Sequence, residues 1–352
     1  MRLTMVNLTT VALTSLLATG AGGRASAADV WHMQSTFPGS LTQLGPAGQR
    51  VAERVTQLTD GELTIEFQEP GATVPALEAF DAVASGKVEA AWSSPGYWAE
   101  DVPALQVFAA VPFGPEAGEY LAWMKYGGGN ELYEEMYRPH NIHGVICGIL
   151  TPEASGWFRT PIRTVDDLDG LRMRFFGLGG EVMEKFGVST QLLAAGDIYQ
   201  AFQSNTLDAV EFSTPAADLS LGLERVAKHY YYPGWHQPAT LLELIVNLDA
   251  WQSLDDTTRL KIETACDANI ANGLAEGVAL QSAALEELEG QGVIIQEWPP
   301  EVLRALREAW RQVADEQASA DPDFALAWSS LRDFRSRNAR WEKWRQLGAM
   351  SN

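Results

Sequence analysis

The second half of the chain carries, at residues 171–212, the sequence LRMRFFGLGGEVMEKFGVSTQLLAAGDIYQAFQSNTLDAVEF, which decides the fold. Short apolar runs in this stretch have the length of strands, and the segments between them have the apolar spacing of helices. The expected strands and helices alternate at 171–176, 181–186, 190–193, 198–203 and 207–212. This order is typical of an α/β lobe with parallel strands.

The same order of elements is expected nearer the amino terminus, at 30–34, 41–58, 63–67, 75–84 and 88–92. The last helix-to-strand turn of each unit also has similar residues, SGKVEA at 85–90 and SNTLDA at 204–209. Gly86 and Asn205 fall where the end of a helix needs a left-handed residue. A chance similarity between two common turns is the alternative interpretation. Five matching elements favour an α/β fold with two similar lobes, and such folds bind ligands in the cleft between lobes.

The remainder of the chain reads as helices, at 255–289, 300–318 and 324–347. The predicted organisation is a signal peptide at 1–27, a region mainly of lobe 1 at 28–150, a region mainly of lobe 2 at 151–250, and a helical region at 251–352. The last helix is rich in aromatic residues among charges. A stripe of that kind usually packs on its own core, and a homodimer contact is the second hypothesis.

The first residues resemble a secretory signal. Arg2 precedes an apolar stretch at 11–18, and Ala25-Ser26-Ala27 has the small-residue pattern of a cleavage site after Ala27. An uncleaved membrane anchor is the alternative, but the stretch is too short and too rich in Thr and Ser to cross roughly 30 Å of hydrocarbon. We therefore expect a protein exported to an extracytoplasmic compartment, with a Gram-negative periplasm as the natural one.

The chain is strongly acidic, with Lys+Arg 25, Asp+Glu 46 and a net charge of −21. The first 27 residues contain Arg2, Arg24 and no acid, so the rest has 23 basic and 46 acidic residues and a charge of −23. That charge disfavours binding to nucleic acids or anionic lipid surfaces. An anionic ligand would need a local positive group inside a shielded site.

Two cysteines are present, Cys147 in an apolar run and Cys266 in a helical pattern. An oxidising compartment permits a disulfide, but nothing in the spacing requires one. Two separate buried thiols are the favoured interpretation from sequence.

No nucleophile elbow, H-E-x-x-H, C-x-x-C or P-loop motif is present. The candidate site residues follow expected strands instead. Arg174 lies at the carboxyl end of its strand, where a guanidinium can grip a carboxylate through two parallel hydrogen bonds, although a solvated or structural Arg is an equal alternative from spacing alone. Glu211 ends an apolar strand, and Glu153 follows the strand at 145–150. Two acids and one Arg around a carboxylate ligand leave excess negative charge, which a hard cation would balance.

Four motifs around these residues resemble the substrate-binding subunits of tripartite ATP-independent periplasmic (TRAP) transporters, the DctP-like family. They are EASGWF at 153–158, RMRFFGLGG at 172–180, DAVEF at 208–212 and YYYPGWHQP at 230–238. The similarity runs over nearly the whole chain after the signal. It is closest to the 2-oxoacid and lactate binders of the branch often called mannitol/chloroaromatic.

The resemblance implies a two-lobed periplasmic binding protein fold, with an interlobe cleft and a long helix bracing both lobes. It implies capture of a small organic acid, such as pyruvate or lactate, and delivery to a membrane permease. Arg174 would bind the substrate carboxylate. A sodium or calcium ion bridging substrate and protein would be held by Glu153, Glu211, the backbone carbonyl of Phe212 and Gln237. The family pattern has Gln at the first of these positions and Glu at the last, and this chain exchanges them.

The first lobe is expected to contribute Phe37, Tyr97 and Trp98 as aromatic walls and Ser94 as a hydrogen-bond donor. Some members of the resembling branch dimerise by swapping the C-terminal helix, which agrees with the aromatic helix noted above. The alternative function is a periplasmic metal-dependent hydrolase or lyase that uses Glu153 and Glu211. The scarcity of His near either glutamate in the sequence favours binding over catalysis. A binding protein for a polyol or an aromatic acid is a further alternative, as is a ligand sensor for a membrane receptor.

Overall fold

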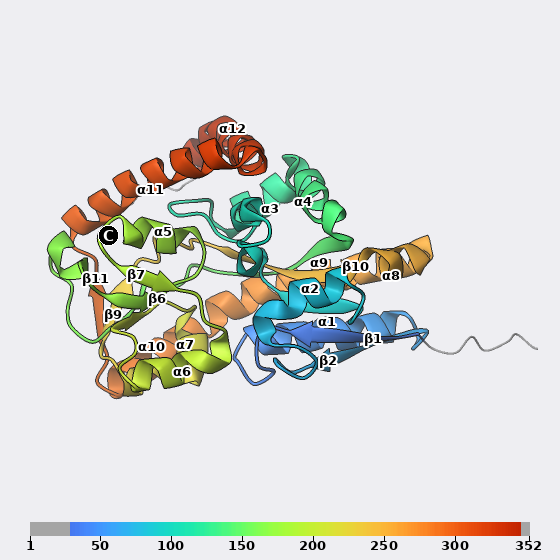
Figure 1. The fold of residues 1–352 in the computed structure, drawn as a ribbon, viewed down its shortest axis with the longest axis horizontal. Helices are drawn as coiled ribbons and strands as arrows, with labels where there is room; N and C mark the ends of the chain where they lie inside the picture. Colours follow the sequence, from blue (N-terminus) through green and yellow to red (C-terminus); the bar gives the residue numbers. More distant parts are fainter. Residues whose placement is uncertain (1–28, 346–352) are drawn as a thin grey trace, which may run out of the picture.

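The computed structural model describes residues 29–345, so the signal peptide expected at 1–27 lies outside the described residues. Within 29–345, no helix has both the length and the apolar character needed to cross a bilayer. The chain forms two α/β lobes side by side, with helices running along both sides of their junction (Figure 1).

The first lobe is built on a five-stranded sheet with strand order β2-β1-β3-β10-β4. The first three strands are parallel, whereas β10 is antiparallel to both of its neighbours. The strands are β1 (Asp29–Ser35), β2 (Leu63–Gln68), β3 (Ala90–Ser93), β4 (Ile142–Leu150) and β10 (Thr240–Asn247). The helices and 3₁₀ turns are α1 (Leu44–Leu58), η1 (Ala76–Glu78), α2 (Ala79–Ala84), η2 (Pro95–Trp98), η3 (Pro103–Phe108), α3 (Ala117–Tyr126), α4 (Gly129–Tyr137), η4 (Arg138–His140) and α8 (Leu248–Ser253).

The second lobe is built on a six-stranded sheet with strand order β11-β9-β5-β8-β6-β7. Its strands are β5 (Gly156–Phe158), β6 (Arg172–Arg174), β7 (Ser189–Gln191), β8 (Ala209–Val210), β9 (His229–Tyr232) and β11 (Ile294–Glu297). Its helices and 3₁₀ turns are η5 (Val165–Leu168), α5 (Leu178–Glu184), α6 (Ala195–Gln203), α7 (Pro215–Leu221) and η6 (Leu223–Arg225). Thus β10 returns from the range expected mainly in lobe 2 to the first sheet, and β11 is a strand inside the range expected to be helical.

The internal repeat expected from sequence is present in both sheets. The first lobe has parallel strands in the order β2-β1-β3, and the second has parallel strands in the order β7-β6-β8. Gly86 and Asn205, at matching turns, both have positive φ, 72° and 61° respectively. The carboxyl ends of the matching strands therefore lie at one edge of each sheet, where a ligand can bind.

Two pairs of helices join the lobes along opposite sides (Figure 1). On one side, α9 (Asp256–Ala279) packs on α1 and β4 of the first lobe, and α10 (Gln281–Gly290) packs on α7 of the second. On the other side, α11 (Pro300–Ala320) packs on α5 and α12 (Pro322–Arg345) packs on η3 and α4. The single long brace expected from sequence is thus two consecutive helices, α9 and α10, and a second brace lies opposite.

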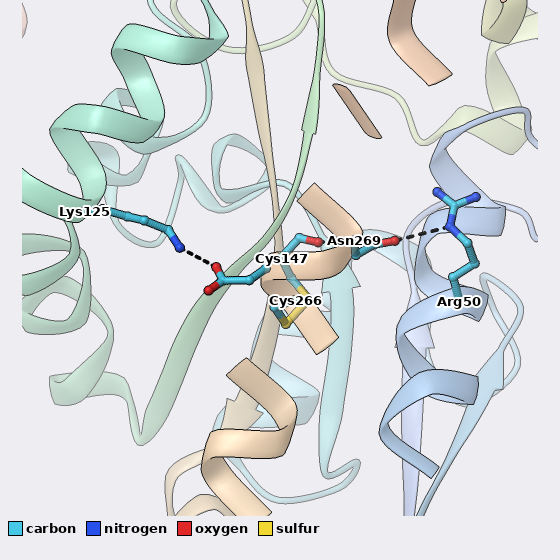
Figure 2. Close-up of a disulfide and its surroundings, with 6 residues drawn as sticks. Arg50, Lys125, Cys147, Cys266 and Asn269 are labelled. Atoms are coloured by element: carbon cyan, nitrogen blue, oxygen red, sulfur yellow. Dashed lines mark hydrogen bonds and ion pairs between the residues drawn. A yellow bond between two sulfur atoms is a disulfide. The ribbon is translucent and has the colours of Figure 1, made fainter. Parts of the chain in front are cut away.

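The cysteine interpretation from sequence was wrong. Cys147 in β4 and Cys266 in α9 form a disulfide with an S–S distance of 2.06 Å (Figure 2). Asn269, one turn further along α9, donates its side-chain N–H to the Cys147 carbonyl at 2.8 Å and accepts from Arg50 Nε at 3.3 Å. The bond therefore joins α9 to the first sheet, at a contact between segments 119 residues apart.

Glu243 lies in the middle of β10, a strand whose residues are all buried. Its carboxylate accepts hydrogen bonds from Trp98 Nε1 at 2.7 Å, from the Tyr137 hydroxyl at 2.7 Å and from the Tyr133 hydroxyl. Burial raises the pKa of Glu243 to about 7, and the three donors oppose that rise. This carboxyl group binds a proton in the folded state at a pH where the unfolded chain has already released it.

We expect the Glu243→Gln variant to show a weaker loss of stability between pH 5 and pH 7.5 than the wild type. A carboxyl group with a raised folded pKa stabilises the fold while both states are protonated, and that contribution is lost as pH rises through about 7. The loss in wild type can reach about 3 kcal/mol from this group. Urea unfolding at both pH values measures it. Asp218, whose pKa burial raises to about 7, contributes the same change in stability in both proteins. An equal total change in the two proteins would therefore contradict the assignment to Glu243.

Candidate functional site

A cavity lies between the lobes at the carboxyl ends of the parallel strands. Its empty volume, including the opening, is about 280 Å³. β1, β3 and β4 lead to it from the first lobe, and β6 and β8 lead to it from the second. Its lining residues are Phe37, Leu44, Ser94, Tyr97, Leu150, Glu153, Arg174, Phe176, Phe212, Ser213, Gln237, Thr240 and Leu242.

Arg174 ends β6 and is 1% exposed. Its Nη1 donates to the Glu211 carbonyl oxygen at 2.6 Å and to Glu211 Oε2 at 2.9 Å. Its Nη2 donates to the Tyr97 hydroxyl of the first lobe at 3.4 Å, and Cζ lies 5.2 Å from the centre of the Phe212 ring. Arg172, two residues earlier on the same strand, is exposed and pairs with Asp208, so of these two arginines Arg174 is the one that lines the cavity.

Glu211 is completely buried at the end of β8. Besides Arg174, its Oε2 accepts from the backbone N–H of Phe176 at 3.0 Å, and its Oε1 lies 3.1 Å from His236 Nε2. These contacts hold the carboxylate in one orientation. A buried carboxylate is stable there because it has a charged partner and hydrogen-bond donors.

Glu153 lies in the loop between β4 and β5 and is also buried. Its Oε1 accepts from the Thr240 hydroxyl at 2.6 Å and from Gln237 Nε2 at 3.2 Å. Glu153 Oε2 and Gln237 Oε1 have no hydrogen-bond partner among the described residues. Burial and the nearby charge of Glu211 raise the pKa of Glu153 well above its ordinary value. Glu153 Oε2 and Gln237 Oε1 can therefore ligate a cation or accept a hydrogen bond from a ligand.

These residues fit a bound cation. Glu153, Glu211 and His236 each offer a ligand atom within 4.8 Å of the others. Two carboxylates against one guanidinium leave a negative charge, and the two orphaned oxygens of Glu153 and Gln237 are oxygen donors of the kind that Na⁺ and Ca²⁺ prefer. A bound cation would supply positive charge between the protein oxygens and an anionic ligand, and would lower the pKa of Glu153.

The first-lobe residues expected from sequence are placed differently from one another. Phe37 and Tyr97 line the cavity and contact each other edge to face, with ring centres 5.7 Å apart. Ser94 also lines it, but its hydroxyl donates to the Leu241 carbonyl at 2.9 Å. Trp98 does not line this cavity, because its indole turns into the core and donates to Glu243.

Several residues that complete the site were missed by sequence reasoning. Phe176 packs on Tyr97 across the lobes, with ring centres 4.9 Å apart. Thr240 and His236 hold the two glutamates, and Ser213 lines the wall next to Phe212. Their signal was proximity in sequence, since all four lie within three residues of a residue that the motifs do identify.

Known proteins resemble this chain in sequence and in fold. Residues 35–321 match the DctP family, described as bacterial extracellular solute-binding protein, family 7. A monocarboxylate 2-oxoacid-binding periplasmic protein from Nostoc sp. is 35% identical over 319 residues, which cover 90% of this chain and 87% of that protein.

Two solved structures are similar over almost their full lengths. A TRAP transporter solute-binding protein from Bordetella bronchiseptica, a mixed-occupancy dimer with calcium and picolinate, is 33% identical and covers 91% of this chain and 95% of its own, with a TM-score of 0.89. A TRAP periplasmic solute-binding protein from Pseudoalteromonas atlantica, with sodium and pyruvate, is 32% identical and covers 91% and 97%, with a TM-score of 0.87.

The fold expected from the sequence motifs is thereby confirmed, with two lobes and mixed sheets. The family match spans most of the chain, and the relative from Nostoc is more than 30% identical over nine-tenths of it. The chain therefore belongs to the DctP family, the bacterial extracellular solute-binding proteins of family 7.

Proposed function

We propose that this chain is the periplasmic solute-binding protein of a TRAP transporter. It captures a small organic acid, a 2-oxoacid such as pyruvate or a hydroxyacid such as lactate, and delivers it to the membrane permease. Family membership supports the transport role. The named ligands of the Nostoc relative and of the Pseudoalteromonas structure support the 2-oxoacid class.

The observation that carries the proposal is the buried guanidinium of Arg174 at an interlobe cavity in an acidic chain. Arg174 contacts Glu211 of the second lobe and Tyr97 of the first, so a carboxylate that it binds would lie between the lobes. Glu153, Glu211, Gln237 and the Phe212 carbonyl are proposed to hold the sodium or calcium ion, which neutralises the remaining negative charge. Phe37 and Tyr97 are proposed as the apolar wall around the ligand.

We propose that the protein binds its ligand without converting it chemically. Metal-dependent hydrolysis needs an open metal position with a water molecule and a nearby general base. Here His236 lies against Glu211, where it orients a carboxylate, and the cavity is small. An aromatic acid remains a second candidate ligand, because the Bordetella relative holds picolinate.

Export through a cleaved signal at 1–27 and a homodimer contact through α12 are parts of the same proposal. The family's extracellular location supports the first, and the dimeric Bordetella structure supports the second. On α12, Trp341 and Trp344 are 62% and 74% exposed, which leaves apolar surface for a partner.

Thermal unfolding of residues 28–352 with a panel of pyruvate, lactate, picolinate and mannitol tests the ligand class. With calcium present, we expect pyruvate or lactate at 100 times its Kd to stabilise the fold by about 2.7 kcal/mol, and mannitol to have no effect. Stabilisation by mannitol alone would overturn the carboxylate assignment. Stabilisation by picolinate alone would replace the 2-oxoacid with an aromatic acid.

A further inference from the structure

Ser213 lies on the cavity wall just beyond the carboxyl end of β8, after Phe212. The residue is 2% exposed, and its side-chain oxygen has no hydrogen-bond partner among the described residues. Other buried serines nearby do have one, since Ser94 Oγ donates to the Leu241 carbonyl and Ser155 Oγ donates to the Pro233 carbonyl. Ser213 therefore lines the cavity and has a buried hydroxyl that no described protein group satisfies.

The backbone of Ser213 is fixed from both sides. Its N–H donates to Asp218 Oδ1 at 3.0 Å, and its carbonyl accepts from the Ala154 N–H at 3.1 Å. Asp218 is itself completely buried, and its Oδ2 accepts from Trp157 Nε1 and from the Tyr230 hydroxyl, both at 2.8 Å. The hydroxyl therefore cannot find a partner through a backbone shift without breaking this network.

A buried hydroxyl without a partner costs free energy that a ligand can recover. In the proposed function, Arg174 and a bound cation neutralise the carboxylate of the ligand, so the group left for Ser213 is a neutral one. A hydroxyl both donates and accepts, which suits a carbonyl oxygen and a hydroxyl oxygen equally. On a small organic acid, such an oxygen sits on C2, next to the carboxylate.

We propose that Ser213 is a ligand-binding and specificity-determining residue that forms a hydrogen bond to the C2 oxygen of a 2-oxo or 2-hydroxy acid. The inference rests on the proposed function, because it presupposes a carboxylate on Arg174. It assigns to one side chain the preference for acids that carry oxygen at C2 over plain carboxylates of the same size.

The Ser213→Ala variant tests the inference by calorimetric titration with pyruvate and with propionate, which lacks the C2 oxygen. We expect the Kd for pyruvate to rise roughly fivefold to tenfold and the Kd for propionate to stay constant. The unfolding temperature should not fall, because the hydroxyl has no partner in the protein. Ser155→Ala is the matched control, a buried serine outside the cavity, and should leave the ratio of the two Kd values unchanged.

Equal Kd changes for both acids, or no change for pyruvate, would overturn the role of Ser213 while leaving the proposed function intact. If wild type binds neither acid, the proposed function and this inference fail together. If the variant does not fold, the crystal structure of the wild-type complex with pyruvate decides. A Ser213 Oγ within about 3 Å of the C2 oxygen supports the inference, and a longer separation overturns it.

Discussion

The Arg174→Gln variant is expected to bind pyruvate at least about a hundredfold more weakly than the wild type. Truncating one member of a buried charge pair across a binding interface typically costs a few kcal/mol or more. In the wild type, Nη1 is engaged by Glu211, and Nη2 has only a long 3.4 Å contact with Tyr97, which leaves this nitrogen for the ligand. Isothermal titration calorimetry in calcium-containing buffer measures the effect.

Two further variants separate charge, geometry and stability. Arg174→Lys keeps the positive charge but cannot form two parallel hydrogen bonds, so it should bind with intermediate affinity. Arg172→Gln is the matched control, because Arg172 lies on the same strand, is exposed and pairs with Asp208 at 2.8 Å. It should bind as the wild type does. Wild-type affinity in a folded Arg174→Gln protein would remove this residue from the site.

The unfolding temperature of Arg174→Gln should also fall, because the variant leaves Glu211 buried without its cationic partner. Breaking such a pair by removing one member costs about 3–5 kcal/mol. Binding must therefore be measured well below the transition. The Phe176 N–H and His236 contacts remain on Glu211 and limit the damage.

Removal of the cation is the second large effect. In buffer without sodium and calcium, with a chelator present, we expect pyruvate affinity to fall by about a hundredfold, because two buried carboxylates then face an anionic ligand with only one guanidinium. The Glu153→Gln variant should bind calcium more weakly than the wild type, also when pyruvate is absent, because it removes one of the two carboxylate charges at the cation site. Calcium titration followed by calorimetry measures this directly.

The exchange of Gln and Glu in this chain offers a matched control for the cation. The double variant Glu153→Gln with Gln237→Glu restores the family pattern while keeping the same total charge. It should recover most of the calcium affinity lost in the single variant, because both side chains contact Thr240 and lie on one side of the cavity. Unchanged pyruvate affinity in cation-free buffer would dismiss the bridging ion.

Much of the fold was predictable because its signals are local. The repeated turns at Gly86 and Asn205 need left-handed residues, and the glycine turn that follows Arg174 placed this residue at the carboxyl end of its strand. The Cys147–Cys266 disulfide was not predictable, because it depends on how α9 packs against β4 across 119 residues. The sequence could identify two buried cysteines but not their distance.

The site was predictable at strand ends and less so in irregular segments. Arg174, Glu211 and Glu153 lie at or just after strand ends. Arg174 and Glu153 line one cavity, whereas Glu211 lies against Arg174 without lining it. Tyr97 and Trp98 are adjacent in a 3₁₀ turn, and only packing decides that the first faces the cavity and the second faces Glu243. His236 lies in a loop without strand alternation, so nothing local indicated that its ring would contact Glu211.

The crystal structure of the protein with pyruvate and calcium tests the account most directly. We predict the carboxylate within hydrogen-bonding distance of the Arg174 guanidinium, and a calcium ion ligated by Glu153, Glu211, the Phe212 carbonyl and Gln237. A ligand held elsewhere in the cavity, with the Arg174 guanidinium still bound only to protein groups, would contradict it.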